Sequence, residues 1–203
     1  MELRFNYFSL RVNFSFFAVL ALMLLLRDRQ TALICFGSAM LHEGGHLLLL
    51  RRFGARVRRV TFGAAGVAIE RADPFLLPPA KEALSALGGV AVNGLLCLCA
   101  LPVRSFLSSK TFSALLCANV LLAALNLLPV YPLDLWRALH ALLEARLSAE
   151  RTEHLLHAIS RGTAAVFCAA CGVYVWKFGR NPSLLAVCVY LLLLNLKRST
   201  SDV

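Results

Sequence analysis

Long apolar runs separated by short polar breaks dominate the hydropathy pattern of this chain. A helix needs about 20 mainly apolar residues to cross a bilayer, and the last two of the six runs are somewhat shorter than that. The runs cover residues 5–26, 31–50, 83–103, 111–128, 162–178 and 183–196. No small-residue cleavage site follows the first run, which therefore favours a retained span over a signal peptide. The pattern predicts an all-α integral membrane protein with about six transmembrane helices.

A different periodicity follows the second run. Between residues 51 and 71, apolar side chains alternate with basic ones around Gly63 and Gly66. This alternation predicts a short β-hairpin after the second transmembrane helix. An edge strand there could pair with an extended substrate backbone. The alternative is an ordinary basic loop resting on lipid headgroups.

Composition supports a membrane protein. Of the 203 residues, 59% are hydrophobic and only 16% are charged, which is too apolar for a soluble domain of this size. The formal net charge of +10 comes from basic residues at the ends of the apolar runs, where they would meet the bilayer, so we expect no nucleic-acid partner. The seven cysteines lie inside apolar runs and behave there as small hydrophobes.

The chemistry concentrates in one motif, His-Glu-Gly-Gly-His, in the second half of the run at 31–50. His42 and His46 are four residues apart, so a helix presents both imidazoles on one face, with Glu43 beside them. Two neutral imidazoles and a third protein ligand hold Zn²⁺ in peptidases, and a neighbouring carboxylate serves as general base. The alternative is two histidines that simply pack on a helix, which would bury a carboxylate in an apolar segment.

A third ligand is expected after the fourth run, in the sequence Asn-Leu-Leu-Pro-Val-Tyr-Pro-Leu-Asp that begins at Asn126 and ends at Asp134. Two prolines stop the helix there and hold Asp134 near membrane depth. The other candidates lie in the more polar, amphipathic segment 135–161, and are His140, Glu144, His154 and His157. We expect the pair His154 and His157 to be solvated. The alternative for Asp134 is an N-cap of a helix over residues 135–147.

The third run contains Gly-Gly-Val-Ala-Val-Asn, from Gly88 to Asn93. Small residues allow helices to approach closely in lipid, which explains the glycines. A buried amide such as that of Asn93 requires partners, and could hydrogen-bond a substrate backbone near a metal.

These motifs together resemble the site-2 protease family of intramembrane zinc metalloproteases, peptidase family M50, over roughly residues 26–147. The resemblance implies one Zn²⁺ per chain held by His42, His46 and Asp134, with Glu43 as base. It also implies that Asn93, Asn126 and Gly89 bind substrate or support the transition state. The implied function is a metalloendopeptidase that cuts a transmembrane protein substrate in or near its membrane segment.

In size and predicted number of spans, the chain resembles the branch of this family that contains stage IV sporulation protein FB. This resemblance implies a membrane-tethered transcription or sigma factor precursor as substrate and a role in sporulation. It also implies a membrane regulatory protein as partner. Two positions depart from the family pattern, Val90 for proline and Leu135 for glycine. They leave open an inactive metal-binding homologue that acts as scaffold or chaperone. A metal transporter is a third reading, although transport needs several polar groups along a path.

Residues 1–203 are expected to form one membrane-embedded domain, with a catalytic core at about 26–147, additional helices at 160–198 and no soluble regulatory domain. Most Lys and Arg lie in the N-terminus, in the segments 51–81 and 137–161, and in the C-terminus. Such residues accumulate on the cytoplasmic side of a membrane. We therefore predict a multi-pass protein of the cell membrane, with the active site toward the cytoplasm.

Overall fold

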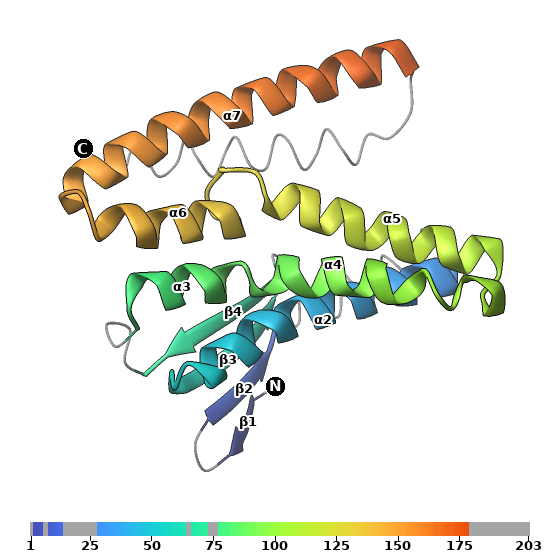
Figure 1. The fold of residues 1–203 in the computed structure, drawn as a ribbon, viewed down its shortest axis with the longest axis horizontal. Coiled ribbons are helices and arrows are strands. Elements are labelled where there is room, and N and C mark those ends of the chain that lie inside the picture. The colour runs from blue at the N-terminus through green and yellow to red at the C-terminus, as the bar shows by residue number, and fades with distance from the viewer. Residues whose placement is uncertain (1, 6–7, 14–27, 64–65, 73–76, 179–203) are drawn as a thin grey trace. The chain divides into compact units, whose positions relative to one another are not determined.

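The computed structural model describes residues 2–5, 8–13, 28–63, 66–72 and 77–178, and the helices and strands below are those of these residues (Figure 1). The chain divides into two compact units, Met1–Ala124 and Leu125–Val203. The first unit contains a small sheet and the helices from α2 through most of α5. The second unit contains α6 and α7.

Helix α2 (Arg29–Arg52) carries the His-Glu-Gly-Gly-His motif and has 24 residues, a length of about 36 Å. Asp28 caps its N-terminus by accepting a hydrogen bond from the Thr31 N–H at 3.2 Å. Hydrogen bonds from the Thr31 side chain and from Lys110 lower the pKa of Asp28 from 3.8 to about 2. Gly54, with a φ of 85°, follows the helix end in the left-handed conformation that glycine adopts without strain.

Two faces of α2 differ in burial. Ser38, His42 and His46 are four residues apart and all are buried. Leu33, Leu41 and Leu48 remain more than half exposed, and a leucine face of this kind suits lipid. The span predicted at 31–50 is therefore present as a helix whose polar residues point into the protein.

The third predicted span is a bent pair of helices, α3 (Pro79–Ala86) and α4 (Gly88–Ala100), with a bend of 46°. The fourth is a single helix, α5 (Ser109–Asn126), preceded by the short 3₁₀ helix η1 (Arg104–Phe106). Within the first unit, the fully buried Asn119 of α5 donates to Ser38 Oγ of α2 at 3.0 Å. An amide bridge of this kind joins helices where lipid offers no hydrogen bonds.

The predicted hairpin is confirmed as the antiparallel pair β3 (Val57–Gly63) and β4 (Gly66–Arg71). It belongs to a four-stranded sheet of order β1-β2-β3-β4, in which β1 (Glu2–Phe5) pairs antiparallel with β2 (Phe8–Val12), and β2 runs parallel to β3. The prediction that a transmembrane helix begins at Phe5 was therefore wrong. Apolar and polar residues alternate at the N-terminus, and this period of two suits a strand. Residues 14–27 of that predicted span lie outside the described residues.

The second unit contains α6 (Asp134–Glu144) and α7 (Ala149–Phe178). The proline-containing loop before α6 packs on α7, because Val130 is fully buried beside Ala164 and the Tyr131 N–H donates to Ser160 Oγ at 2.9 Å. The sequence divided this region into a surface segment at 135–161 and a span at 162–178. The structure instead joins residues 149–178 in one helix of 30 residues. Helical periodicity runs through the charged first half, since Thr152, Leu156, Ser160 and Ala164 are all buried.

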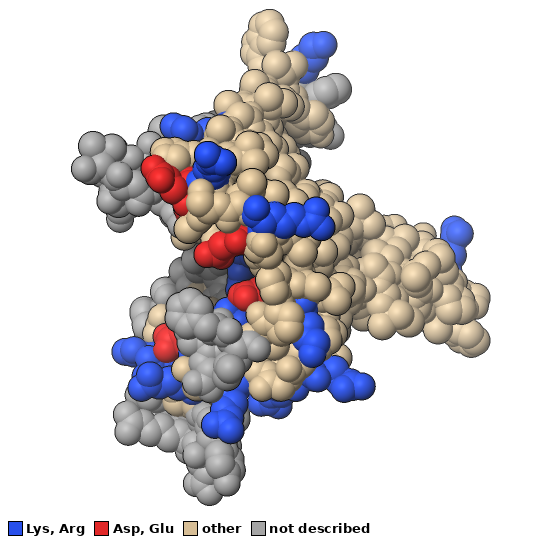
Figure 2. Space-filling model, turned by 60° about the vertical axis from the view of Figure 1, so that its left-hand side comes forward, with Lys and Arg blue, Asp and Glu red and all other residues tan. Residues whose placement is uncertain are grey.

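Among the described residues, α2, α5 and α7 are each long and apolar enough to cross a membrane, and the bent pair α3–α4 would make a fourth span. The sixth predicted span, at 183–196, lies outside the described residues. Figure 2 shows one face, with wide areas free of Lys, Arg, Asp and Glu. Large exposed apolar side chains, among them Phe106 and Trp176 at 87% and 85%, fit an environment of lipid.

Candidate metal centre

Two imidazoles meet on the buried face of α2. His42 and His46 are 4% and 5% exposed, and their Nε2 atoms lie 3.3 Å apart. The helical spacing of four residues predicted this shared face. When both Nε2 atoms are deprotonated, two such nitrogens on one helix face supply half of the ligands of a tetrahedral zinc site.

The Nδ1 atom of each ring contacts the bent helix pair α3–α4. His46 Nδ1 lies 2.9 Å from the carbonyl oxygen of Ser85 in α3, and His42 Nδ1 lies 3.0 Å from Nδ2 of Asn93 in α4. The last four carbonyls of a helix have no partner within that helix, so the end of α3 at Ala86 leaves the Ser85 carbonyl able to accept from His46. The sequence did not point to Ser85, because its contribution comes from the backbone.

Glycines make room for this arrangement. A Cβ placed on Gly89 would lie 2.5 Å from His42 Cε1 and 2.6 Å from His46 Nε2. Gly45 of α2 and Gly88 face each other, and a Cβ on Gly88 would lie 2.7 Å from the Gly45 carbonyl oxygen. Both helices therefore approach at backbone distance, and the absence of a Cβ at Gly89 leaves space for the two rings. The predicted contribution of Gly89 to substrate binding or transition-state support stays a prediction.

Asp134 completes a possible ligand set. His42 and His46 lie in the first unit and Asp134 in the second; all three residues are buried, and each offers a ligand atom that could hold a metal ion. Asp134 is the first residue of α6, and the N-cap position is Leu133, so the structure does not use Asp134 as the N-cap. Two imidazoles and a carboxylate, shielded from bulk water, match the donor set of hydrolytic zinc sites.

Glu43 and Asn126 occupy less buried positions. Glu43 is half-buried and follows His42 on α2, and Asn126 is half-buried as the last residue of α5. The role of Glu43 in proton transfer stays a prediction. The contribution of Asn126 to substrate binding stays a prediction.

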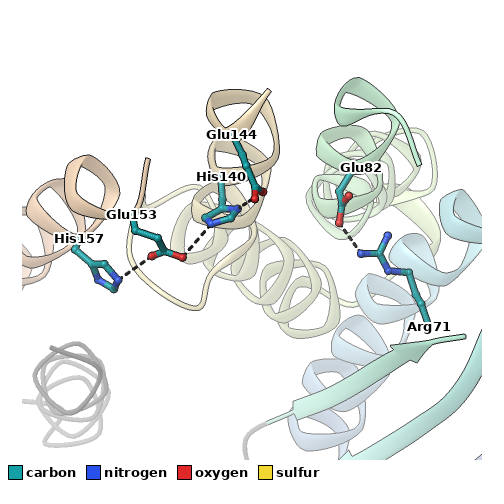
Figure 3. Close-up of polar contacts among 6 residues, drawn as sticks. All are labelled: Arg71, Glu82, His140, Glu144, Glu153 and His157. Carbon is teal, nitrogen blue, oxygen red and sulfur yellow. Dashed lines mark hydrogen bonds and ion pairs between the residues drawn. The ribbon is translucent and has the colours of Figure 1, made fainter. Parts of the chain in front are cut away.

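Two of the other histidine candidates, His140 and His157, form a cluster with glutamates within the second unit (Figure 3). Glu153 of α7 lies between two imidazoles, 3.1 Å from His140 Nε2 and 3.0 Å from His157 Nε2, and Glu144 lies 3.4 Å from His140 Nδ1. His154 is exposed, as predicted, but His157 is half-buried and paired, so the expectation that both are solvated was wrong. His157 follows Glu153 at the i to i+4 spacing, which the sequence pattern could have indicated.

The described part of the chain thus has the architecture of a helical membrane protein with a buried group of two histidines and one aspartate. No family model matches the sequence, and no curated protein matches it. A solved structure with a similar fold is a site-2 protease from Methanocaldococcus jannaschii, with a TM-score of 0.69 and 17% sequence identity over 97% of this chain and 94% of that one. At this identity the likeness shows a shared fold, and the predicted likeness to the sporulation branch stays untested.

Proposed function

We propose that this chain is an intramembrane zinc metalloendopeptidase that cuts a transmembrane protein substrate in or near its membrane segment. The observation that carries the proposal is the pair of buried imidazole nitrogens, which lie 3.3 Å apart on α2. Asp134 is proposed as the third ligand. The shared fold with a solved site-2 protease supports it. His42, His46 and Asp134 would hold one Zn²⁺, and the bound ion would supply an activated water and polarise the scissile carbonyl.

Glu43 would move the protons. Its carboxylate accepts a proton from the attacking water and later delivers it to the leaving amine, which spares the reaction a free hydroxide and an amide anion. The apolar faces of α2 and the bent pair would keep bulk water away, which strengthens the electrostatic interactions of these groups. Asn126 is proposed to contact the substrate backbone.

The substrate would need an extended backbone, because a helix hides its peptide bonds. Strand β4 lies at the edge of the sheet within the first unit, and an edge strand presents unpaired backbone groups. An extended substrate segment could add to that edge. We also propose, from the distribution of Lys and Arg, that the site opens toward the cytoplasmic side.

The test compares Glu43→Gln with the unmodified chain, in detergent and in liposomes. We expect Glu43→Gln to keep about one zinc per chain and to lose cleavage of a membrane-embedded reporter by at least about 100-fold, the scale of a lost general base. Asp134→Ala should lose the zinc. Equal cleavage by Glu43→Gln would remove Glu43 from the mechanism.

The same samples separate the alternative functions. An unmodified chain that binds zinc and cleaves no membrane protein would favour the scaffold or chaperone, to which the departures at Val90 and Leu135 point. Zinc uptake into proteoliposomes that contain either the unmodified chain or Glu43→Gln would favour a transporter.

A further inference from the structure

Asn93 contacts Nδ1 of His42, the ring nitrogen that does not point toward His46. It is 0% exposed, its Nδ2 lies 3.0 Å from His42 Nδ1, and its Oδ1 is buried with no hydrogen-bond partner among the described residues. All of these atoms belong to the first unit. A buried oxygen without a hydrogen-bond partner lowers the stability of the fold by about 1–3 kcal/mol, which favours an amide orientation that gives Oδ1 a partner.

The contact between His46 and the Ser85 carbonyl defines the tautomer that a metal-binding histidine needs at this site. The Ser85 carbonyl can only accept a hydrogen bond, so His46 carries its proton on Nδ1 and directs the lone pair of Nε2 toward His42. His42 must have the same tautomer if its Nε2 is to bind metal. Its Nδ1 would then donate, and it needs an acceptor behind it.

Only one end of the Asn93 amide meets that need. With Nδ2 toward His42, the amide donates to Nδ1, which leaves the proton of a neutral His42 on Nε2, where metal should bind. A half-turn of the amide exchanges oxygen and nitrogen with almost no change of shape. Oδ1 then accepts from His42 Nδ1–H, and the buried oxygen gains its partner.

We propose that Asn93 is a positioning residue for the metal centre, whose Oδ1 accepts from His42 Nδ1–H and keeps the Nε2 lone pair toward the ion. This inference rests on the metal centre of the proposed function. It differs from the substrate contact that the sequence suggested for Asn93. Outer hydrogen bonds to ligand histidines commonly fix the tautomer and orientation of the ring, and their loss weakens metal binding by about 10–100-fold.

The test exploits the difference between a donor and an acceptor. Asn93→Leu removes both, whereas Asn93→Asp keeps only acceptors at nearly the same volume. Affinity for Zn²⁺ is measured for the full chain in detergent by competition with a chelator. We expect about 10–100-fold weaker binding for Asn93→Leu and an affinity close to the parent for Asn93→Asp.

Asn119 provides the matched control. It is equally buried, but its amide donates to Ser38 Oγ and the Leu115 carbonyl rather than to a histidine. Asn119→Leu and Asn119→Asp should leave zinc affinity unchanged, which separates the effect at Asn93 from a general cost of altering a buried amide or adding a buried charge.

A second readout observes the proton directly. In zinc-loaded protein with ¹⁵N-labelled histidine, His42 and His46 should both show a hydrogen-bonded Nδ1–H, and Asn93→Leu should weaken the bond of His42 alone. Parent-like zinc binding by Asn93→Leu, or binding by Asn93→Asp as weak as that of Asn93→Leu, would overturn the inference. Neither measurement uses proteolysis, so a chain that binds zinc without cleaving would refute only the proposed peptidase.

Discussion

Two pairs of histidines in this chain have opposite surroundings. The Nε2 atoms of His42 and His46 lie 3.3 Å apart, while Nδ1 of His42 contacts the amide of Asn93 and Nδ1 of His46 contacts the carbonyl oxygen of Ser85. His140 and His157 are instead separated by the carboxylate of Glu153. The difference shows that the neighbours of a histidine pair decide its use. Neutral contacts on the outer nitrogens leave the inner ones for a metal, whereas a carboxylate between the rings already occupies them.

Removal of one ring from each pair should give the largest contrast. His46→Ala deletes a proposed ligand, so zinc content is expected to fall from about one per chain to near zero. His140→Ala removes an ion-pair partner on α6 and should leave zinc content unchanged. Elemental analysis of the purified proteins decides the matter, and equal zinc loss in both variants would refute the distinction.

A smaller but sharper effect is expected at the glycines of α4. Gly89→Ala places a methyl group where His42 and His46 now lie, so the rings must move and zinc affinity should drop by at least about 10-fold. Gly94→Ala, with no atom within 4 Å of its added Cβ, should keep the affinity and gain about 0.5–1 kcal/mol of stability. Chelator competition measures the zinc affinity, and thermal unfolding measures the stability. Normal zinc binding by Gly89→Ala would mean that the rings are not confined.

The smallest effect concerns the second pair. Glu153→Gln weakens the contacts with His140 and His157, at a cost of about 1 kcal/mol, because these side chains are partly exposed. Zinc affinity should not change. Glu150→Gln, exposed on the same helix, serves as the control and should cost less. A Glu153→Gln protein with normal stability but weaker zinc binding would reverse the roles assigned to the two pairs.

Sequence patterns identified much of this arrangement. The spacing of His42 and His46 predicted a shared face of α2, and the alternation around Gly63 and Gly66 predicted the hairpin, because both depend on local periodicity. The prolines before Asp134 indicated a helix break, which the loop at 127–133 confirms.

Other features depend on contacts that a linear pattern does not contain. The Ser85 carbonyl meets His46 only because α3 ends at Ala86, and Asn93 meets His42 only because Gly45 and Gly88 allow α2 and the bent pair to touch. The charges of residues 149–161 favour a surface segment, but the four-residue spacing of the buried positions continues through them, and residues 149–178 form one helix.

The parallel pairing of β2 with β3 has a consequence for the order of folding. The hairpins β1–β2 and β3–β4 each join neighbouring segments and can form quickly, but β2 and β3 are separated by a connection that includes all of α2. Contacts between distant segments form slowly, because a long stretch of chain must first be closed into a loop. We therefore expect the four-stranded sheet to be complete only after α2 has entered the bilayer. A complete sheet would then indicate that α2 has been inserted.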